Sequence, residues 1–374
     1  MRGPAPAWRR FLRLAAPVAL GFLLTACGGG SLPAGRPAGT AVRLTRPSSP
    51  DRRRSTGATP TTTAPAPSTG GPAAGGAAAP LPTPASLVPF AGTTAAAGEG
   101  SWNPAGRPVA GTAAVEETSL VPPGGTQPAG IAWMDTRLLS AQLYSGSKSP
   151  GGGPYRYTAP VQPAQASTLV AAFNGGFYMN QAEGGYYTEG RTVVPLVTGA
   201  ASLVIYADGS VDVGAWGTDV TMTPNVVAVR QNLVPLVAGG QPTPQAASSD
   251  WQAWGATCGA TSCAPTVPGV EQQWRSGVGV TADGGLVYVT GPALAPLQLA
   301  DLLVRAGAVR GMQLDINPDW TVFVTYDPPT PGGLAAPSNG SKLVAATVQG
   351  PWTFFEPWWA RDFVTMSARA EPTG

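Results

Sequence analysis

The sequence predicts an α+β fold, rich in β-strands arranged in mixed or antiparallel sheets with few helices and preceded by a disordered tether rich in Pro, Ala and Gly. Three observations lead to this expectation. Short β-rich runs recur downstream of residue 130, two pairs of them are joined by Asp-Gly, and one segment has a convincing helical periodicity. No repeat with a period of about 20–50 residues is evident, which argues against a solenoid or a propeller.

Strand-like segments occupy most of the chain beyond residue 130. Residues 130–145 begin with an apolar run, and residues 169–173 form a continuous apolar run typical of a buried strand. Residues 202–216 and residues 276–289 each contain two β-rich runs separated by Asp-Gly. Because glycine adopts a positive φ without steric penalty, Asp-Gly between such runs is a strong hairpin signal. We therefore expect two antiparallel hairpins.

One helix is expected at residues 297–306, where apolar side chains recur at helical spacing before Gly307, which supplies the stop. A short strand at residues 311–314 follows and ends at Asp315. With the strands above, these elements define a predicted globular domain at residues 105–370, which is long enough to enclose a sizeable core.

The N-terminal residues resemble a lipoprotein signal peptide. Four arginines precede or border an apolar stretch, residues 14–24, which is too short to span a bilayer because spanning takes about 20 apolar residues. Leu24-Thr25-Ala26-Cys27 then resembles a lipobox, in which small residues precede the lipid-accepting thiol. We expect residues 1–26 to be the signal peptide and Cys27 to anchor the chain outside the cytoplasm, on the cell membrane of a bacterium. The alternative is an ordinary signal peptide with an incidental cysteine.

Residues 27–104 are expected to form the disordered tether. They are mostly small residues and proline, and such a segment buries too little apolar surface to offset the entropy of ordering its backbone. The formal net charge of +2 hides an uneven distribution, because 10 of the 22 Lys and Arg but only one of the 20 Asp and Glu lie at or before Arg54. The remaining 12 basic and 19 acidic residues give a net charge of −7, which argues against nucleic-acid binding.

The cysteine and histidine content narrows the chemistry. Cys258 and Cys263 lie close in the sequence and, in an exported protein, are expected to form a local disulfide. The chain has no histidine, which excludes Ser-His-Asp and Cys-His devices and imidazole metal sites, and it has no P-loop motif for nucleotides. Carboxylate chemistry assisted by Arg, Asn and backbone donors remains, and it suits hydrolysis of glycosidic or phosphodiester bonds.

Four segments stand out by their order and spacing: residues 171–178, 184–191, 274–284 and 302–315. In this order they resemble the phosphodiester glycosidase family, and the resemblance covers most of the region between Gly130 and Asp315. An Asn-Gly-Gly-Phe sequence in the first segment and an R-[ST]-x-x-G-x-x-x-D-G sequence in the third are specific when they occur together.

The resemblance implies a hydrolase of sugar-1-phosphodiesters. Carried over by position, Asp315 would be the key carboxylate, Arg275 a phosphate clamp and Asn174 a polar site residue. The chemistry agrees, because the planar fork of Arg matches phosphate oxygens and an aspartate can act as acid, base or nucleophile. The further substrate-binding positions expected from these segments are Gly175, Gly176, Tyr187, Arg191 and Asn317.

The segment after the last of these strands departs from the family. The family continues Leu-Asp-Gly-Gly-Gly-Ser, whereas this chain reads Leu314-Asp315-Ile316-Asn317-Pro318-Asp319. The glycine-rich backbone, an anion nest, is therefore absent, and proline donates no N–H. Asp319 is a further catalytic candidate, as the partner of Asp315 in a carboxylate pair. The oxygens here also leave room for a divalent cation shared with a substrate phosphate, although Trp320 replaces the glycine that an EF-hand calcium loop needs.

The leading hypothesis is an envelope-tethered hydrolase that acts on a carbohydrate or sugar-phosphate polymer and reaches the membrane through its lipid. It expects Asn174, Arg275, Asp315 and Asp319 to converge on one cleft. The missing glycine-rich segment motivates an alternative, a non-catalytic glycan-binding or envelope-scaffold lipoprotein on the same fold. The aromatic residues between 352 and 359 motivate a third, a protein–protein assembly module.

Overall fold

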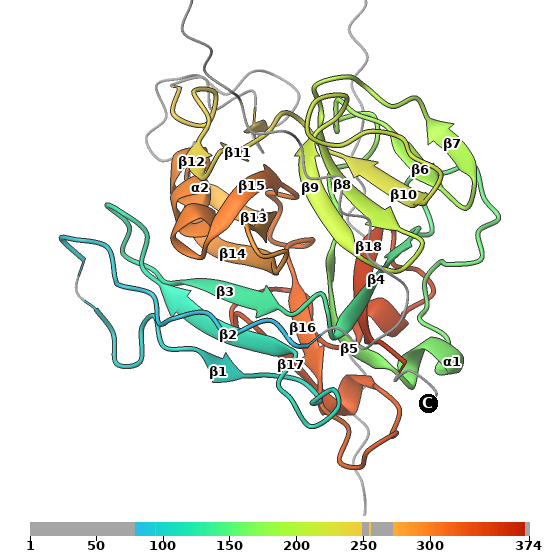
Figure 1. Ribbon diagram of the computed structural model, residues 1–374, viewed down its shortest axis with the longest axis horizontal. Helices are drawn as coiled ribbons and strands as arrows, with labels where there is room; N and C mark the ends of the chain where they lie inside the picture. The colour runs from blue at the N-terminus through green and yellow to red at the C-terminus, as the bar shows by residue number, and fades with distance from the viewer. Residues whose placement is uncertain (1–78, 94, 249–253, 256–271, 371–374) are drawn as a thin grey trace, which may run out of the picture. The chain divides into compact units, whose positions relative to one another are not determined.

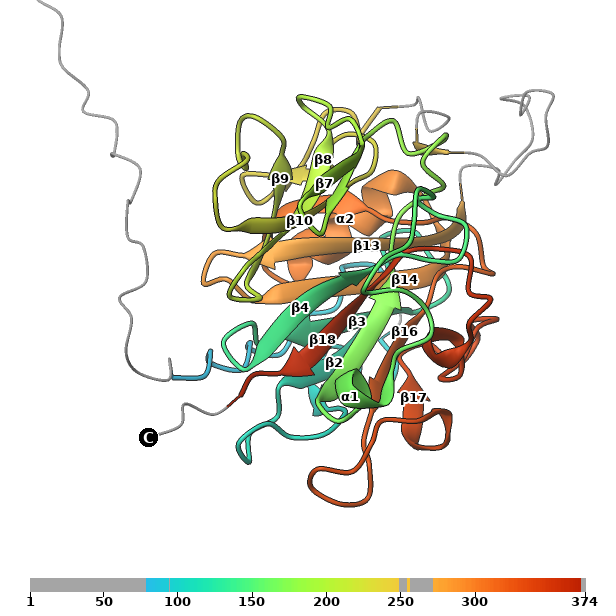
Figure 2. The same ribbon diagram turned by 90° about the vertical axis from the view of Figure 1, so that its right-hand side faces the viewer.

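Three β-sheets dominate the fold (Figure 1, Figure 2). A computed structural model describes residues 79–93, 95–248, 254–255 and 272–370. Within these residues every pair of neighbouring strands is antiparallel, and two α-helices are present. The β-rich fold with few helices that the sequence predicts is thus confirmed.

The largest sheet has eight strands and contains one of the two predicted hairpins. Its central strands, β13 and β14, are joined by a turn with Asp283 and Gly284, whose φ is +93°. Residues 276 to 280 of β13 pair with residues 290 to 286 of β14. In spatial order the sheet consists of β1 (Asn103–Pro104), β2 (Val115–Leu120), β3 (Ala129–Met134), β14 (Leu286–Leu294), β13 (Gln273–Thr281), β15 (Ala308–Gln313), β11 (Val237–Ala238) and β12 (Gln241–Pro242).

The second sheet has five strands drawn from distant parts of the chain. Its central strand β5 is the apolar run predicted as a buried strand, and all six of its residues are buried. β5 pairs on one side with β16 and on the other with the C-terminal β18. In spatial order the sheet consists of β17 (Gly340–Lys342), β16 (Phe323–Tyr326), β5 (Leu169–Asn174), β18 (Phe363–Ala368) and β4 (Leu139–Tyr144).

The third sheet, also five-stranded, contains the other predicted hairpin. Strands β8 and β9 pair from Ala201–Ala215 to Ile205–Val211 around the turn at Asp208 and Gly209. In spatial order the sheet consists of β7 (Arg191–Val194), β6 (Tyr186–Thr188), β10 (Val226–Gln231), β8 (Ala201–Tyr206) and β9 (Val211–Ala215).

Helix α2 (Pro296–Arg305) confirms the predicted helix and packs on the eight-stranded sheet. Proline occupies its first turn, where a backbone N–H is not needed. The side chain of Gln298 accepts a hydrogen bond from the N–H of Ala295 at 2.8 Å, and Gly307 adopts φ +93° after the last turn. Leu299, Leu302 and Leu303 are fully buried. The other helices are short: α1 (Pro163–Ala166) and the 3-10 turns η2 (Pro337–Asn339) and η3 (Thr353–Phe355).

One apolar core receives side chains from all three sheets. Tyr288 of β14 lies at its centre, with its ring 5.3 Å from the ring of Phe173 and 5.1 Å from that of Phe323. Burying an aromatic side chain of this size stabilises the fold by about 1.5–3 kcal/mol. The hydroxyl of Tyr288 leaves this core toward Asn174, so the core fixes one end of the polar cluster described below.

The folded region begins before the predicted boundary at residue 105. Leu81 is buried, and its N–H donates to Asp135 at 2.8 Å. Leu87 and Phe90 pack against the core beside α2, and their segment is joined to the sheet because the N–H of Leu87 donates to Gly100. Widely spaced apolar residues among prolines were enough to order this part of the predicted tether. Among the described residues, no helix has the length and apolar character needed to cross a membrane.

Candidate active site

Asn174 ends β5 and is buried between two sheets. Its Oδ1 accepts hydrogen bonds from the hydroxyl of Tyr288 at 2.7 Å and from the N–H of Val322 at 3.1 Å. Its Nδ2 donates to Gly175 O at 2.7 Å and to Ser276 Oγ at 3.0 Å. Since all four partners are fixed, Asn174 cannot rotate freely and holds the hydroxyl of Ser276 in place.

Ser276 links Asn174 to Asp315. Its Oγ accepts a hydrogen bond from the N–H of Asp315 at 3.1 Å, and its own N–H donates to Asp315 O at 2.8 Å. These contacts continue the pairing of β13 with β15 by two residues beyond the end of β15. The sequence therefore places Asp315 correctly at a strand end, and the structure joins it to Asn174 through Ser276.

The carboxylate of Asp315 is 1% exposed, and its two oxygens have different surroundings. Oδ1 accepts hydrogen bonds from its own turn, from the N–H of Ile316 at 2.8 Å and of Asn317 at 2.9 Å. Oδ2 lies 2.9 Å from Nη2 of Arg361 in an ion pair, but no donor among the described residues has hydrogen-bond geometry to it. Oδ2 is thus the oxygen left for chemistry.

Burial raises the pKa of Asp315 to about 6, although Arg361 and the two backbone N–H groups favour the charged form. The free-energy cost of removing the Asp315 carboxylate from water exceeds the stabilisation that the Arg361 guanidinium gives to its charge. A carboxyl group with such a pKa exchanges a proton near neutral pH, which suits a general acid or base.

Arg361 lies two residues before the start of β18, and its guanidinium packs against two aromatic rings. Its Cζ lies 3.9 Å from the ring centroid of Tyr178 and 5.0 Å from that of Trp320. Its Nη1 donates to Gly176 O at 3.3 Å. Cation–π contacts orient the planar group, so the charge is held against Asp315.

Gly175 and Gly176 are required by close packing rather than by a positive φ. A Cβ on Gly175 would overlap the carboxylate of Asp362, and a Cβ on Gly176 would lie 2.6 Å from Asn232 Oδ1 and 2.8 Å from Arg230 Cζ. Asp362 and Arg230 form a second buried ion pair at 2.8 Å. The two glycines therefore let the chain pass directly over this pair, beside Arg361.

Arg275 lies on the other face of β13 from Ser276. Its Nε donates to Leu294 O at 2.7 Å, and its Nη1 donates to Gln313 Oε1 at 2.7 Å and to Trp254 O at 3.3 Å. The side chain is completely buried. In this structure the guanidinium holds together β13, β14 and the end of β15, and it does not contact Asp315 or Asn174 through any of these bonds.

Asp319 and Asn317 form a small turn after Asp315. The N–H of Asp319 donates to Asn317 Oδ1 at 2.9 Å, and Asp319 is exposed. No interaction between the carboxylates of Asp315 and Asp319 is present. The part of the chain that the structure describes contains no group of three or more His, Cys, Asp and Glu that could hold a metal ion. Of the four residues expected in one cleft, Asn174 and Asp315 are joined by hydrogen bonds through Ser276.

Tyr187 and Arg191 lie in the third sheet. Tyr187 packs against a small apolar cluster with Val204 and Val229. Arg191 is exposed; it donates to Pro154 O at 3.0 Å, and its guanidinium carbon lies 4.9 Å from the ring centroid of Tyr155. None of these contacts reaches Asn174, Ser276, Asp315 or Arg361, which together are called the Asp315 cluster. The predicted lipid site at Cys27 and the predicted disulfide between Cys258 and Cys263 lie outside the described residues.

Sequence reasoning missed Arg361, Arg230 and Asp362. The available signal was Arg361-Asp362, two opposite charges placed between an aromatic run and a predominantly apolar final segment. Such a position favours buried, paired charges, because unpaired charges are excluded from a core. Arg230 gave no comparable signal, since it lies in β10 (Val226–Gln231), whose partner strands β6 and β8 come from other segments of the chain.

Residues 167–319 match the sequence model of the phosphodiester glycosidase family. The match makes this part of the chain similar to the phosphodiester glycosidases, a family of hydrolases. The matched range contains Asn174, Ser276 and Asp315, whereas Arg361 lies beyond it.

Three solved structures are among those similar to this chain. The catalytic domain of zebrafish N-acetylglucosamine-1-phosphodiester alpha-N-acetylglucosaminidase, auto-inhibited by its pro-peptide, is 18% identical, with a TM-score of 0.42 over 72% of this chain and 88% of that chain. A hypothetical protein from Synechocystis is 10% identical, with a TM-score of 0.36 over 70% of this chain and 64% of that chain. A Burkholderia pseudomallei protein described as a putative exported protein is 13% identical, with a TM-score of 0.30 over 64% of this chain and 74% of that chain. No curated protein matches the chain.

Proposed function

We propose that the chain hydrolyses sugar-1-phosphodiester or related glycosidic linkages, with Asp315 as the reacting carboxyl group and Arg361 as the cation that binds the phosphate. The observation that carries this proposal is the ion pair between Asp315 and Arg361. It lies at the end of the strand pair formed by β13 and β15, within reach of two of the family segments. Asn174 and Ser276 position the Asp315 backbone.

The proposed reaction consumes one water. The bond between the anomeric carbon and the phosphodiester oxygen breaks, that oxygen leaves on the phosphate, and the oxygen of water ends on the anomeric carbon. Asp315, whose pKa is raised to about 6 by burial, is available in both protonation states near neutral pH. It can therefore transfer a proton to the departing oxygen or take one from the water.

Arg361 supplies a cation for the phosphate in place of the backbone N–H donors of the missing glycine-rich segment. Its guanidinium offers paired N–H donors that match phosphate oxygens. A phosphate that binds there competes with Asp315 for the same group and frees Oδ2 for chemistry. The side chains of both residues are almost fully buried, so substrate has to reach them past Tyr178 and Trp320, which are partly exposed and cover the guanidinium.

The test is turnover of sugar-1-phosphodiester model substrates by the purified protein and by Asp315→Asn. Asp327→Asn is the matched control, because Asp327 is an exposed carboxylate that follows β16 outside the cluster. We expect Asp315→Asn to lose at least about a hundredfold in kcat/KM, typical of removing a general acid or base, while Asp327→Asn keeps its rate. A comparable loss in Asp319→Asn would instead support the carboxylate pair.

The second candidate is a non-catalytic glycan-binding protein on the same fold. It is favoured by the replaced glycine-rich segment and by the engagement of Asp315 Oδ1 with its own turn. Glycan binding that survives Asp315→Asn, in a well-folded protein that turns over none of the phosphodiesters, would support this candidate over the hydrolase.

We also propose that the protein acts outside the cytoplasm, anchored to the membrane by a lipid on Cys27. The support is the order of arginines, apolar stretch and lipobox-like sequence. Metabolic labelling with a palmitate analogue should mark the protein in membranes and leave Cys27→Ser unlabelled. Equal labelling of both, or none of either, would contradict the anchor.

A further inference from the structure

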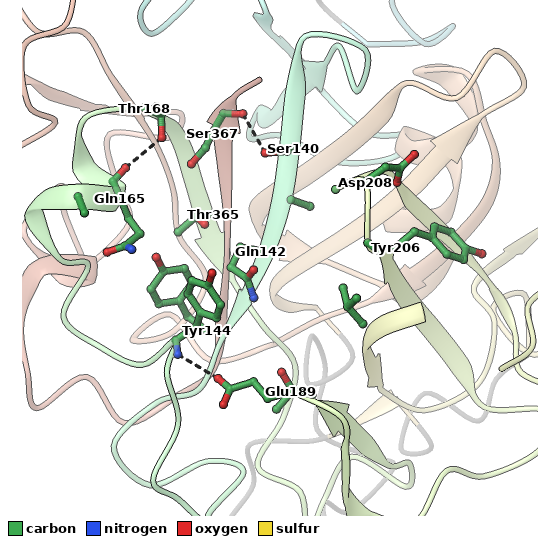
Figure 3. A pocket seen from close by; sticks show the side chains of 17 residues that line it. Ser140, Gln142, Tyr144, Gln165, Thr168, Glu189, Tyr206, Asp208, Thr365 and Ser367 are labelled. Carbon is green, nitrogen blue, oxygen red and sulfur yellow. Dashed lines mark hydrogen bonds between the residues drawn. The ribbon is translucent and has the colours of Figure 1, made fainter. Parts of the chain in front are cut away.

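A cavity with a mixed polar and apolar lining lies between the second and third sheets, and Asp315 does not line it. It has a volume of about 490 Å³, within the range of about 300–1,000 Å³ that small-molecule sites occupy. Its residues come from β4, β18, the α1 region, the end of β6 and the turn between β8 and β9. Figure 3 shows these side chains around the cavity. None of them belongs to the Asp315 cluster.

The floor of the cavity is a ladder of polar cross-strand pairs. Gln142 of β4 is directly opposite Thr365 of β18, and Ser140 is opposite Ser367. Paired side chains on one sheet face lie about 5 Å apart, and successive pairs along a strand lie about 7 Å apart. Four hydroxyl and amide groups therefore form a flat patch comparable in extent with a sugar ring.

This patch has unused hydrogen-bonding capacity. Gln142 donates to Leu143 O at 3.0 Å, but its Oε1 accepts no hydrogen bond from the described residues. The side-chain amide of Gln165, which lines the cavity beside it, likewise makes none with them. Ser140, Gln142 and Ser367 are partly exposed within the cavity, so water or a ligand rich in hydroxyl groups can satisfy these polar groups.

Aromatic rings form one side of the cavity. Tyr144 and Tyr157 line it, with ring centroids 5.6 Å apart and planes at 66°. Tyr157 is partly exposed, so its ring is accessible to a ligand. An apolar ring face beside amide and hydroxyl groups matches a sugar, which has C–H faces and hydroxyl edges.

The charge of the cavity argues against an anionic ligand. The residues that line it include Glu189 and Asp208 but no Lys or Arg within the described part of the chain. Glu189 is fixed by the N–H groups of Arg156 and Tyr157 at 2.9 and 3.0 Å. The nearby cations are behind the lining: Arg156 lies over the ring of Tyr157, and Arg369 donates to Asp208 O. A phosphate or a uronate would meet like charge here.

We infer that this cavity is a binding site for neutral carbohydrate, separate from the Asp315 cluster. Gln142 and Thr365 donate hydrogen bonds to sugar hydroxyl groups and accept hydrogen bonds from them, Glu189 accepts hydrogen bonds from them, and Tyr157 packs against a C–H face. The site would hold an uncharged stretch of glycan independently of any reaction at Asp315, so it stands whether or not Asp315 is catalytic.

The test is calorimetric titration of the full chain with maltohexaose, cellohexaose and chitohexaose, which are neutral, and with hexagalacturonate, which is anionic. We expect saturable binding of at least one neutral probe and at least about tenfold weaker binding of hexagalacturonate. Gln142→Met and Thr365→Val keep side-chain volume but remove hydrogen bonds, and each should weaken binding by up to about tenfold. Gln241→Met, on the exposed β12, is the matched control and should bind like the unmodified chain.

Asp315→Asn separates this inference from the proposed reaction. We expect it to bind the neutral probe with unchanged affinity, because Asp315 does not line the cavity. Three results would overturn the inference: no binding of any neutral probe, tighter binding of hexagalacturonate, or unchanged affinity in Gln142→Met. Loss of binding in Asp315→Asn would place the carbohydrate at the Asp315 cluster instead.

Discussion

Protonation of Asp315 should make the protein more stable in mild acid, relative to the Asp315→Asn variant. Burial raises the folded-state pKa of Asp315 from 3.8 to about 6. A carboxyl group with a raised pKa binds its proton more tightly in the folded than in the unfolded protein. Its contribution to stability is therefore complete below about pH 3.8 and is lost as the pH rises through about 6.

The size of the effect follows from the two pKa values. Between about pH 7.5 and about pH 4.5, proton uptake by Asp315 should increase the free energy of unfolding by about 2 kcal/mol, out of about 3 kcal/mol for the full shift. Asp315→Asn lacks this increment. Other groups titrate in both proteins and cancel in the difference, among them Glu117, whose pKa burial raises to about 7.

Urea unfolding of both proteins at a series of pH values measures this difference. We expect the stability of the unmodified protein relative to Asp315→Asn to rise by about 2 kcal/mol as the pH falls over this range. A difference that falls with decreasing pH would show that Arg361 outweighs burial and lowers the pKa of Asp315. That result would refute the argument that Asp315 is available as an acid near neutral pH.

Three further predictions concern the residues around Asp315. Gly175→Ala should destabilise the fold by about 3 kcal/mol, since its Cβ would overlap the buried carboxylate of Asp362. Thermal unfolding should show this loss of stability. Gly153→Ala is the control and should keep its stability, because a Cβ there makes ordinary contacts. Arg361→Met removes the cation that lowers the pKa of Asp315, so the limb of the pH–rate profile that reports Asp315 should move to higher pH. An unmoved limb would exclude this coupling. Arg275→Met should lower stability by about 2–4 kcal/mol because buried carbonyl acceptors lose their donor; a large rise in KM with stability intact would instead favour the phosphate clamp.

The elements that the sequence predicts well are those with a local signal. The Asp-Gly turns identify both hairpins, and the leucine spacing followed by Gly307 identifies α2, because in each case the determining residues are adjacent in the chain. The buried run 169–173 is likewise confirmed as β5. Strands β10, β16 and β18 were not predicted, since their pairing depends on partners far away in sequence.

The same distinction between local and long-range signals applies to the residues of the candidate site. Asn174 and Asp315 follow strands with a local signal, and the structure joins them through Ser276. The side chain of Arg275 points to the face of β13 that meets Trp254 and Gln313. The register of the sheet determines which side chains of β13 point to that face. Arg361 reaches Asp315 from a segment near the C-terminus, a contact that only the assembled sheets create.

Turnover of a sugar-1-phosphodiester by the unmodified protein, Asp315→Asn and Arg361→Met, with folding verified for each, tests the central claim most directly. We predict release of free sugar and phosphomonoester by the unmodified protein and at least about a hundredfold loss of kcat/KM in Asp315→Asn. Undiminished turnover by a folded Asp315→Asn variant would contradict the assignment of Asp315 as the reacting carboxyl group.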